Sequence, residues 1–404
     1  MPRANGLLFI FLASLAPTWA QEAAPAARPK LVDLGAKACI PCKLMAPILE
    51  ELKQEYAGRF DVEFVDVWQK ENAPLAKQYN INSIPTQVFL DDAGKELWRH
   101  EGFISKHNIL AKWRELNVDV GGPPQTFARL EPAKADERPK SSICFMCDGN
   151  LNAKTLVTVE TAKGEVRLCS PHCFFIMYSC LMEDKTGLEK KATVADWTTG
   201  KPVPFAEAVF LYGLDEGTGR PVVKAFTTKD AALQERQSAG GSLVNWPVLR
   251  DKELAARCGF CDRAVNPEDA AVVKAEGLYT WGCCSHCALG VAARTGKEIE
   301  VHQRDGLTGE EIIVRTLGGS VAFIEPKTAV AWFGQRKTAD GKWVSAGCFH
   351  QGFFATEENL KKWLEQRPYA TGRLISIDQA LADKMKLTPA QIQKACKIGE
   401  CAPK

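Results

Sequence analysis

The chain lacks two features that would point to a membrane or nucleic-acid partner. Beyond residue 20, no hydrophobic stretch approaches the roughly 20 residues that a membrane-spanning helix needs. No long basic run stands out either, and 51 Lys and Arg residues nearly balance 49 Asp and Glu residues. The first absence argues against a permanent membrane anchor. The second gives no reason to expect nucleic acid or a membrane surface as a partner.

Residues 1–20 have the organisation of a secretory signal. Arg3 precedes an apolar core of about ten residues, and small residues end the segment at Ala20. This core is too short for a spanning helix, and the first cysteine, Cys39, lies too far on to be a lipid-attachment site. We therefore expect cleavage near Ala20 and a periplasmic or secreted protein, in a compartment where thiols tend to pair.

Cysteine is the unusual component of the composition. The 404 residues include 15 cysteines, most of them in short-spaced groups that disulfide stapling alone does not predict. A chain of this length and 46% apolar content can form two or three domains. A Gly- and Pro-rich, charged stretch at 119–140 is typical of an exposed linker. A weaker shift in composition marks a second boundary near 250–257.

The segment 30–118 is predicted to mix strands and helices around a short cysteine motif. Cys39-Ile40-Pro41-Cys42 lies between the first predicted strand and the helix that follows it. This order of elements resembles the thioredoxin family, which implies a thioredoxin fold. The elements expected from periodicity and turn residues are strands at 31–34, 62–67, 87–90 and 96–99 and helices at 43–56, 74–79 and 106–116.

The thioredoxin resemblance assigns roles to four residues. Cys39, at a helix N-terminus where the dipole lowers a thiol pKa, is the expected nucleophile, and Cys42 is the resolving thiol. Asp33 matches the buried proton-transfer position, and Pro85 matches the cis proline beside the disulfide. Ala38 replaces the family's usual Trp. The implied activity is thiol–disulfide exchange with a periplasmic partner; the alternative is the same fold with an inert disulfide or a bound metal.

Beyond the linker, a cysteine pattern occurs twice. Each copy has the form CxxCD, then a spacer of equal length, then CxxHC, which predicts an internal duplication. We expect two related cysteine-rich α+β units at 141–250 and 255–385, so the whole chain is predicted to be an α/β and α+β multidomain protein. The paired residues are Cys144, Cys147, Asp148, Cys169, His172 and Cys173 in the first copy and Cys258, Cys261, Asp262, Cys283, His286 and Cys287 in the second.

Each copy predicts a site for a soft metal ion. Strand-like segments between the cysteine pairs (156–159 with 166–168, and 271–273 with 278–281) suggest a hairpin, with one pair on a knuckle and the other at a helix start. Four thiolates held in this way form a tetrahedral site, for which zinc is the ordinary occupant and Cu(I) or mercury also fit. His172 and His286 either replace one sulfur or pack beside the site. No organic cofactor is expected.

The first unit resembles small treble-clef metal modules and, more closely, the NosL-type copper chaperone of nitrous-oxide reductase. The resemblance extends over 194–200 (VADWTTG), 225–229 (AFTTK) and the strand that follows Gly240-Gly241. In that family a short Cys/Met segment forms the copper site, and 144–147 is the matching place here. Met146 is accordingly either a copper ligand or an apolar core residue. A metal-recipient protein is a further expected partner.

The second unit resembles organomercurial lyase at 278–281 (LYTW), 305–309 (DGLTG), 324–326 (IEP) and 348–355 (CFHQGFFA). In the lyase, two thiolates capture mercury and an acid protonates the carbon. The thiolates fall on Cys284 and Cys348, but the acid position falls on Cys287, which also completes the four-cysteine pattern. The lyase is ordinarily cytosolic, whereas an export signal is expected here. Metal binding is therefore favoured over carbon–mercury cleavage.

Three cysteines have weaker assignments. Cys180 is expected to be a buried apolar residue. Cys396 and Cys401, in the predicted tail 386–404, form either a local disulfide or a mobile thiol pair.

Three functions remain open. In the favoured one, an exported thioredoxin domain keeps soft-metal thiolate sites reduced in an oxidising compartment. In the second, an organomercurial-lyase-like enzyme carries its own reductant. In the third, the chain is an oxidoreductase with structural zinc modules.

Overall fold

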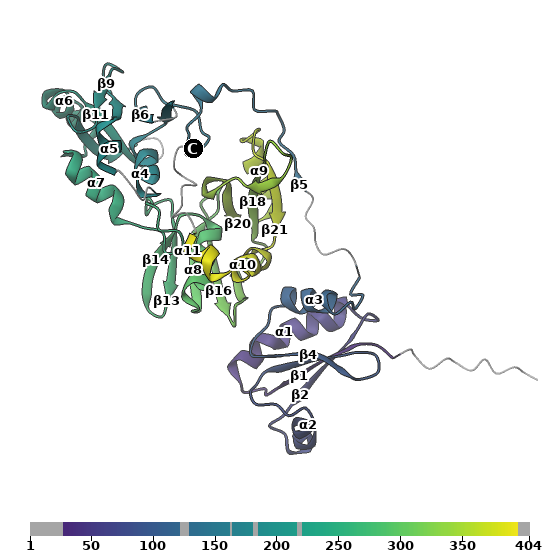
Figure 1. Ribbon diagram of the computed structural model, residues 1–404. Helices are drawn as coiled ribbons and strands as arrows, with labels where there is room; N and C mark the ends of the chain where they lie inside the picture. Colours follow the sequence, from purple (N-terminus) through teal and green to yellow (C-terminus); the bar gives the residue numbers. More distant parts are fainter. Residues whose placement is uncertain (1–26, 122–128, 162–163, 181–184, 216–219, 395–404) are drawn as a thin grey trace, which may run out of the picture.

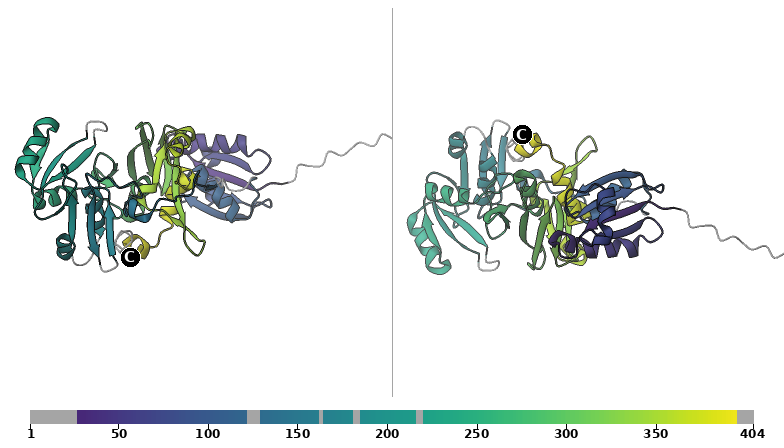
Figure 2. Two further views of the ribbon diagram at one scale, coloured as in Figure 1. Left: turned by 90° about the horizontal axis from the view of Figure 1, so that it is seen from above. Right: turned by 90° about the horizontal axis from the view of Figure 1, so that it is seen from below.

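The computed structural model describes residues 27–121, 129–161, 164–180, 185–215 and 220–394. The predicted class, a multidomain chain of mixed α/β and α+β structure, is confirmed. Figures 1 and 2 show three units in a row, with the C-terminal unit between the N-terminal domain and the middle unit. Within the described ranges, no helix has both the length and the apolarity needed to cross a bilayer.

The N-terminal domain is a four-stranded mixed sheet of order β2-β1-β3-β4. β1 (Lys30–Gly35) runs parallel to β2 (Asp61–Asp66) and antiparallel to β3 (Thr86–Leu90), and β4 (Glu96–Glu101) pairs with β3. Alternate side chains point to opposite faces. Leu31 and Phe89 therefore join the core with α1 (Ile40–Glu55) and α3 (Lys106–Glu115). Val32 and Val88 pack on the other face with Leu75 of α2 (Ala73–Gln78), which follows η1 (Lys70–Asn72).

Helix α1 begins three residues before the predicted start at residue 43, and the prediction was wrong there for a definable reason. Cys39 is the N-cap, and its Sγ accepts a hydrogen bond from the backbone N of Cys42 at 3.3 Å. Pro41 lies in the first turn, where its missing N–H and fixed φ are favourable. The redox motif is therefore the beginning of the helix, and it does not form a loop before the helix.

The middle unit has two antiparallel sheets. The first, of order β7-β6-β8-β9, follows the linker and η2 (Lys140–Ser142), and the second has the order β11-β10-β12. The aromatic side chains of α4 lie in the core between the sheets and α7. The elements are β6 (Val157–Thr161), β7 (Gly164–Leu168), α4 (Pro171–Cys180), α5 (Lys185–Lys190), β8 (Ala192–Ala195), β9 (Pro202–Pro204), β10 (Val209–Leu214), β11 (Pro221–Phe226), α6 (Lys229–Ala239), β12 (Ser242–Val244) and α7 (Trp246–Ala255).

The C-terminal unit has a five-stranded antiparallel sheet, β14-β13-β15-β16-β17, and a second sheet in which β18 pairs with β19, β20 and β21. Helix α8 packs against α10 and the first sheet. The elements are β13 (Ala271–Ala275), β14 (Leu278–Gly282), α8 (Ser285–Thr295), β15 (Ile299–Arg304), β16 (Glu311–Leu317), β17 (Ser320–Glu325), β18 (Val330–Lys337), β19 (Trp343–Ser345), η3 (Cys348–His350), β20 (Gln351–Phe354), α9 (Glu357–Glu365), β21 (Gly372–Ile375), α10 (Ile377–Met385) and α11 (Pro389–Lys394).

The two cysteine-rich units share local hydrogen bonding. Asp148 and Asp262 both adopt positive φ (55° and 60°), and each donates its backbone N–H to the carbonyl of the first cysteine of its unit. Later in each unit, Asp196 and Asp305 each accept two backbone N–H groups of the next turn, and with the second carboxylate oxygen a backbone N–H from another segment. The aspartates of the repeated pattern thus have the same structural role in both units.

Three predicted boundaries differ from the structure. Within the stretch 119–140, expected to be an exposed linker, β5 (Arg129–Leu130) pairs with β21 and becomes part of the C-terminal unit. Helix α7 continues across the weaker boundary at 250–257 and ends only at Ala255. In the predicted tail, α11 packs on α8, and Arg294 donates to the carbonyl of Ile392. Cys396 and Cys401 lie outside the described residues.

The units contact one another through specific side chains. Asn108 of α3 donates to Ser320 Oγ at 2.8 Å, so the N-terminal domain meets the C-terminal unit. Ser179, at the end of α4, accepts the backbone N–H of Ala264 at 2.9 Å. His350 Nε2 lies 2.9 Å from a carboxylate oxygen of Asp148. These contacts link each unit to the next.

Candidate functional site

The redox motif occupies the N-terminus of α1. Cys39 and Cys42 form a disulfide with their Cα atoms 5.2 Å apart. The Cys42 side chain is buried and Cys39 is half-buried, so a partner can reach only Cys39 readily. Ile40 and Trp68 are 75% and 64% exposed, which leaves apolar surface available to such a partner. The geometry suits Cys39 to attack and Cys42 to resolve.

Pro85 lies at the same end of the sheet as the redox motif. The Ile84–Pro85 peptide bond is cis, as the resemblance implied. β3 begins directly after it, and Leu34 pairs with Thr86. The proline therefore lies where β1 ends and the chain leaves toward Cys39. Its carbonyl accepts the backbone N–H of Gly102 at 2.8 Å, which ties this loop to the one after β4.

Asp33 is fully buried in β1. Its Oδ1 accepts a hydrogen bond from Gln87 Nε2 at 2.6 Å, and Oδ2 has no hydrogen-bond partner among the described residues. Burial raises the pKa of Asp33 to about 6, and the bond from Gln87 opposes part of this rise. A carboxyl group that titrates near neutrality can take up and release protons during thiol exchange. Gln87 was not anticipated from the sequence, although a Gln within a buried strand is a recognisable signal.

We expect Asp33→Asn to stabilise the N-terminal domain at pH 7.5 but not at pH 3.5. The folded pKa of about 6 exceeds the usual 3.8, so the wild-type domain is penalised by ionisation. The loss in free energy of unfolding is absent below pH 3.8, where Asp33 is protonated in both states, and complete above pH 6. Its full size, from a pKa difference of about 2, is roughly 3 kcal/mol. Denaturant unfolding at both pH values measures it. An equal effect of the substitution at both pH values would contradict the assignment.

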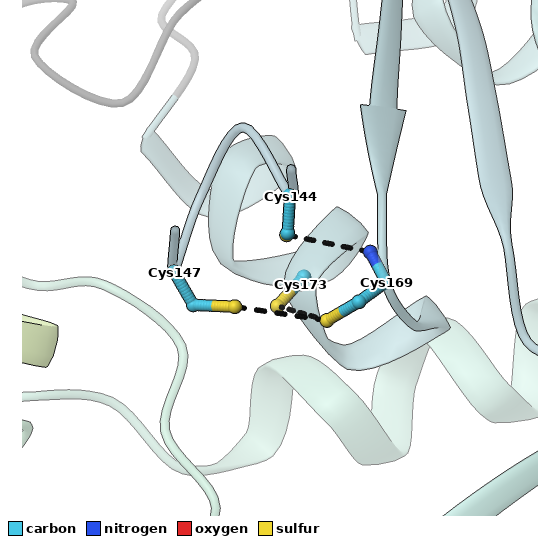
Figure 3. A group of neighbouring side chains, drawn as sticks. All are labelled: Cys144, Cys147, Cys169 and Cys173. Carbon is cyan, nitrogen blue, oxygen red and sulfur yellow. Dashed lines mark hydrogen bonds between the residues drawn. The ribbon is translucent and has the colours of Figure 1, made fainter. Parts of the chain in front are cut away.

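The first thiolate cluster comprises Cys144, Cys147, Cys169 and Cys173 (Figure 3). Their four sulfur atoms all lie within 4.8 Å of one another. The Cys147–Cys169 and Cys169–Cys173 sulfur distances are 3.7 and 3.5 Å. A tetrahedral site with metal–sulfur bonds of about 2.3 Å places its sulfurs about 3.8 Å apart, whereas a disulfide needs about 2.05 Å. The spacing is too wide for a disulfide and would suit a tetrahedral metal ion.

The elements of the middle unit explain this arrangement. The knuckle after η2 supplies Cys144 and Cys147, the end of β7 supplies Cys169, and the first turn of α4 supplies Cys173. The Cys144 sulfur accepts the backbone N–H of Cys169 at 3.3 Å. This hydrogen bond and the helix N-terminus both favour thiolate over thiol.

Six cysteines gather in the C-terminal unit. The expected set Cys258, Cys261, Cys283 and Cys287 forms one group with sulfurs within 4.8 Å of one another. Cys283 and Cys287 also form a second group with Cys284 and Cys348. The sequence had paired Cys284 with Cys348 through the lyase resemblance. It did not show that Cys283 and Cys287 of the repeated pattern would lie in the same group as this pair.

The cysteines of each cluster influence one another's ionisation. Hydrogen bonds from Cys147, Cys169 and Cys173 hold the pKa of Cys144 well below its usual value, and Cys261, Cys283 and Cys287 do the same for Cys258. The contact with Cys144 raises the pKa of Cys147, and the contact with Cys258 raises the pKa of Cys261. The pKa values of Cys169 and Cys348 are lowered as well, so each cluster combines sulfurs that ionise easily with sulfurs that hold their protons. A metal ion that bound there would have to displace the remaining protons, so its affinity would fall as pH falls.

The structure places His172, His286 and Met146 outside the thiolate groups. His172 Nδ1 lies 2.7 Å from the carboxylate of buried Glu253 in α7. His286 is buried beside the Phe333 ring, its Nδ1 is 3.1 Å from Ser285 Oγ, and burial lowers its pKa to about 3. Neither histidine joins a sulfur group, and both lie where the packing alternative would place them.

Met146 and Cys180 are in apolar surroundings. Met146 packs against the cores of both cysteine-rich units, which is the core alternative for this residue. Cys180 is buried in the core of the C-terminal unit, although it lies at the end of α4.

Known protein families match two regions of the chain. A family model described as thioredoxin matches residues 12–115. Thioredoxin of Staphylococcus epidermidis is 42% identical over 80 residues, which are 20% of this chain and 74% of that protein. The chain belongs to the thioredoxin family. Thioredoxin of Staphylococcus aureus is 41% identical over the same share. The family membership rests on the N-terminal domain alone, because the thioredoxin model matches no residue after 115.

A second family model, alkylmercury lyase (MerB), matches residues 267–387 of this thioredoxin-family chain. The range includes Cys283, Cys284, Cys287 and Cys348 and leaves out Cys258 and Cys261. The mercury-bound form of MerB2 is a solved structure with 20% identity that covers 39% of this chain and 81% of its own, at a TM-score of 0.26. A thioredoxin-like protein from Clostridium perfringens has 29% identity, covers 24% and 76%, and has a TM-score of 0.22.

Proposed function

We propose that the chain is an exported thiol–disulfide oxidoreductase that maintains its own soft-metal thiolate sites in the reduced, metal-binding state. The observation that supports this most directly is the presence, in one chain, of a redox disulfide and of sulfur groups spaced at metal-site distances. A thiolate site that is oxidised to disulfides loses its ligands. Copper, mercury and zinc are the soft ions that such sites accept.

The electron balance of the proposed reaction is simple. The Cys39 thiolate attacks a disulfide formed between two cluster cysteines and displaces one of them as a thiolate. Cys42 then attacks the mixed disulfide, which releases the second cluster thiol and leaves Cys39 and Cys42 oxidised. Two electrons have moved, and a dithiol protein in the same compartment must reduce the Cys39–Cys42 pair again.

The experiment measures recovery of metal binding after oxidation. The clusters are oxidised with tetrathionate, limiting dithiothreitol is supplied, and uptake of Zn²⁺ or Hg²⁺ is followed. We expect the wild type to recover at least about tenfold faster than a Cys39→Ser variant. A chemical reductant that acts without Cys39, a trialkylphosphine, must restore both proteins fully. Equal recovery of the two with dithiothreitol would overturn the redox coupling.

The second candidate function is carbon–mercury cleavage, and a specific contact favours it. Cys348 Sγ lies 3.7 Å from Cys287 Sγ, and both are grouped with Cys284. Two thiolates and a thiol acid are thus together, with Cys287 at the position that the family resemblance gives to the acid. Methane release from methylmercury, lost in Cys284→Ser, would support the lyase. Binding of methylmercury without methane would leave only metal handling.

A further inference from the structure

The two sulfur groups of the C-terminal unit overlap: they share two sulfurs, and each has two further sulfurs of its own. Cys283 and Cys287 belong to both groups, whereas Cys258 and Cys261 belong only to the first and Cys284 and Cys348 only to the second. Each group alone has the four sulfurs that one tetrahedral ion requires. One ion cannot bind all six.

We propose that the C-terminal unit holds a binuclear metal–thiolate centre in which Cys283 and Cys287 bridge two soft metal ions. Cys258 and Cys261 complete the first ion's coordination, and Cys284 and Cys348 complete the second. The ratio is that of a Zn₂Cys₆ module, two ions with six cysteines. The inference deepens the metal-binding half of the proposed function and is independent of the redox half.

Sulfur distances place both proposed bridges at coordination spacing from the outer ligands. Cys261 Sγ lies 3.5 Å from Cys283 Sγ, which is one edge of the first tetrahedron. Cys348 Sγ lies 3.7 Å from Cys287 Sγ, which is one edge of the second. Both values are close to the 3.8 Å or so of a tetrahedral thiolate edge. Each bridging sulfur is thus placed to share its lone pairs with an ion on either side.

The outer ligands also receive backbone hydrogen bonds, one in each group. Cys258 Sγ accepts the N–H of Cys283 at 3.4 Å, and Cys284 Sγ accepts the N–H of Cys287 at 3.3 Å. These bonds tie one outer sulfur of each group to the backbone of a proposed bridging residue. Cys283 and Cys348 are the two members that are only half-buried, so an ion can enter and leave at their side.

The middle unit provides a natural comparison within the same chain. Ser170 there occupies the helix N-terminal position that Cys284 occupies in the C-terminal unit, and its Oγ accepts the N–H of Cys173 at 3.3 Å. A serine caps the helix equally well but does not bind a soft metal ion. The middle cluster consequently has one group of four sulfurs, and we expect a single ion in it.

Cadmium loading of the full chain tests the proposal. Cys39, Cys42, Cys396 and Cys401 are all changed to Ser in the reference protein, so that only the clusters can bind ¹¹³Cd²⁺. We expect three ions per chain by native mass spectrometry. The ¹¹³Cd spectrum should contain three resonances, two of which split each other through the shared sulfurs. Two ions per chain, or three resonances without mutual splitting, would overturn the binuclear centre.

A matched variant sharpens the count. Cys284→Ser reproduces the helix cap of the middle unit, so it should fold, bind two ions per chain and lose the splitting. Cys180→Ala, which removes a thiol outside the clusters, should keep three ions and the splitting. If Cys284→Ser still binds three ions, the assignment of Cys284 is wrong. If the reference protein binds no cadmium at all, the metal-binding half of the proposed function fails as well. Two ions per chain would contradict only the binuclear centre.

Discussion

A Cys39→Ser variant is expected to reduce insulin disulfides no faster than the uncatalysed reaction with dithiothreitol. Cys39 is the half-buried member of the pair and caps α1, where the helix dipole stabilises its thiolate. A serine hydroxyl at this position is not a nucleophile toward a disulfide. The buried Cys42, at 3% exposure, cannot take over the attack. Turbidity from precipitating insulin chains measures the rate.

The Cys42→Ser variant should fail in a different way. Its Cys39 can still attack, but no thiol resolves the mixed disulfide, so the variant should accumulate as a covalent adduct with the substrate. Mass spectrometry under non-reducing conditions detects this adduct. Cys180→Ala is the control and should keep wild-type activity. If Cys39→Ser retains insulin reduction, the redox assignment is wrong.

Removing metal from the first thiolate cluster is expected to unfold much of the middle unit. Cys144 of the knuckle and Cys173 of α4 both lie in its core together with Phe174, so a shared metal ion would join two segments of that core. Structural zinc contributes apparent free energies of about 10–16 kcal/mol in small modules. Loss of even a third of this, about 4 kcal/mol, lowers Tm by roughly 15 °C for a unit of this size.

Calorimetry of the reduced protein with zinc and with a strong chelator measures this shift. Cys147→Ser should lower Tm even with zinc present, because it leaves three sulfurs. The chelator effect should also be reproduced without chelator as pH falls, because thiolates that regain protons release the ion. A chelated protein with unchanged Tm would show that the cluster has no structural role.

The redox domain was largely predictable because its signals are local. The order of strands and helices along the chain, the position of Pro85 and the buried Asp33 all followed from sequence spacing and a family resemblance. Cys39 was correctly expected at a helix N-terminus, but the start of α1 was predicted three residues late, at residue 43, since a cysteine side chain as N-cap is uncommon. The bond from Gln87 to Asp33 depends on the pairing of β1 with β3, which spacing alone does not specify.

The thiolate clusters were predictable only in part, for the same reason. CxxC spacing brings two sulfurs together locally, and the repeated pattern indicated which pairs combine. Cys348 joins Cys283, Cys284 and Cys287 only because β18 pairs with β20 and places η3 beside α8. Glu253 meets His172 only through the packing of α7 on α4. Such contacts between distant segments have no short-range sequence signal.

The contact between Asp148 and His350 joins the two clusters mechanically. Asp148 directly follows Cys147 of the first cluster, and His350 lies two residues after Cys348 of the second. We expect a metal ion that shifts one of these segments to act on the other through this contact. Thermodynamic linkage is reciprocal. If an ion in the first cluster changes the metal affinity of the second by some factor, an ion in the second changes the affinity of the first by the same factor. Linkage of this kind would appear as a metal-filling curve that departs from the curve of independent sites.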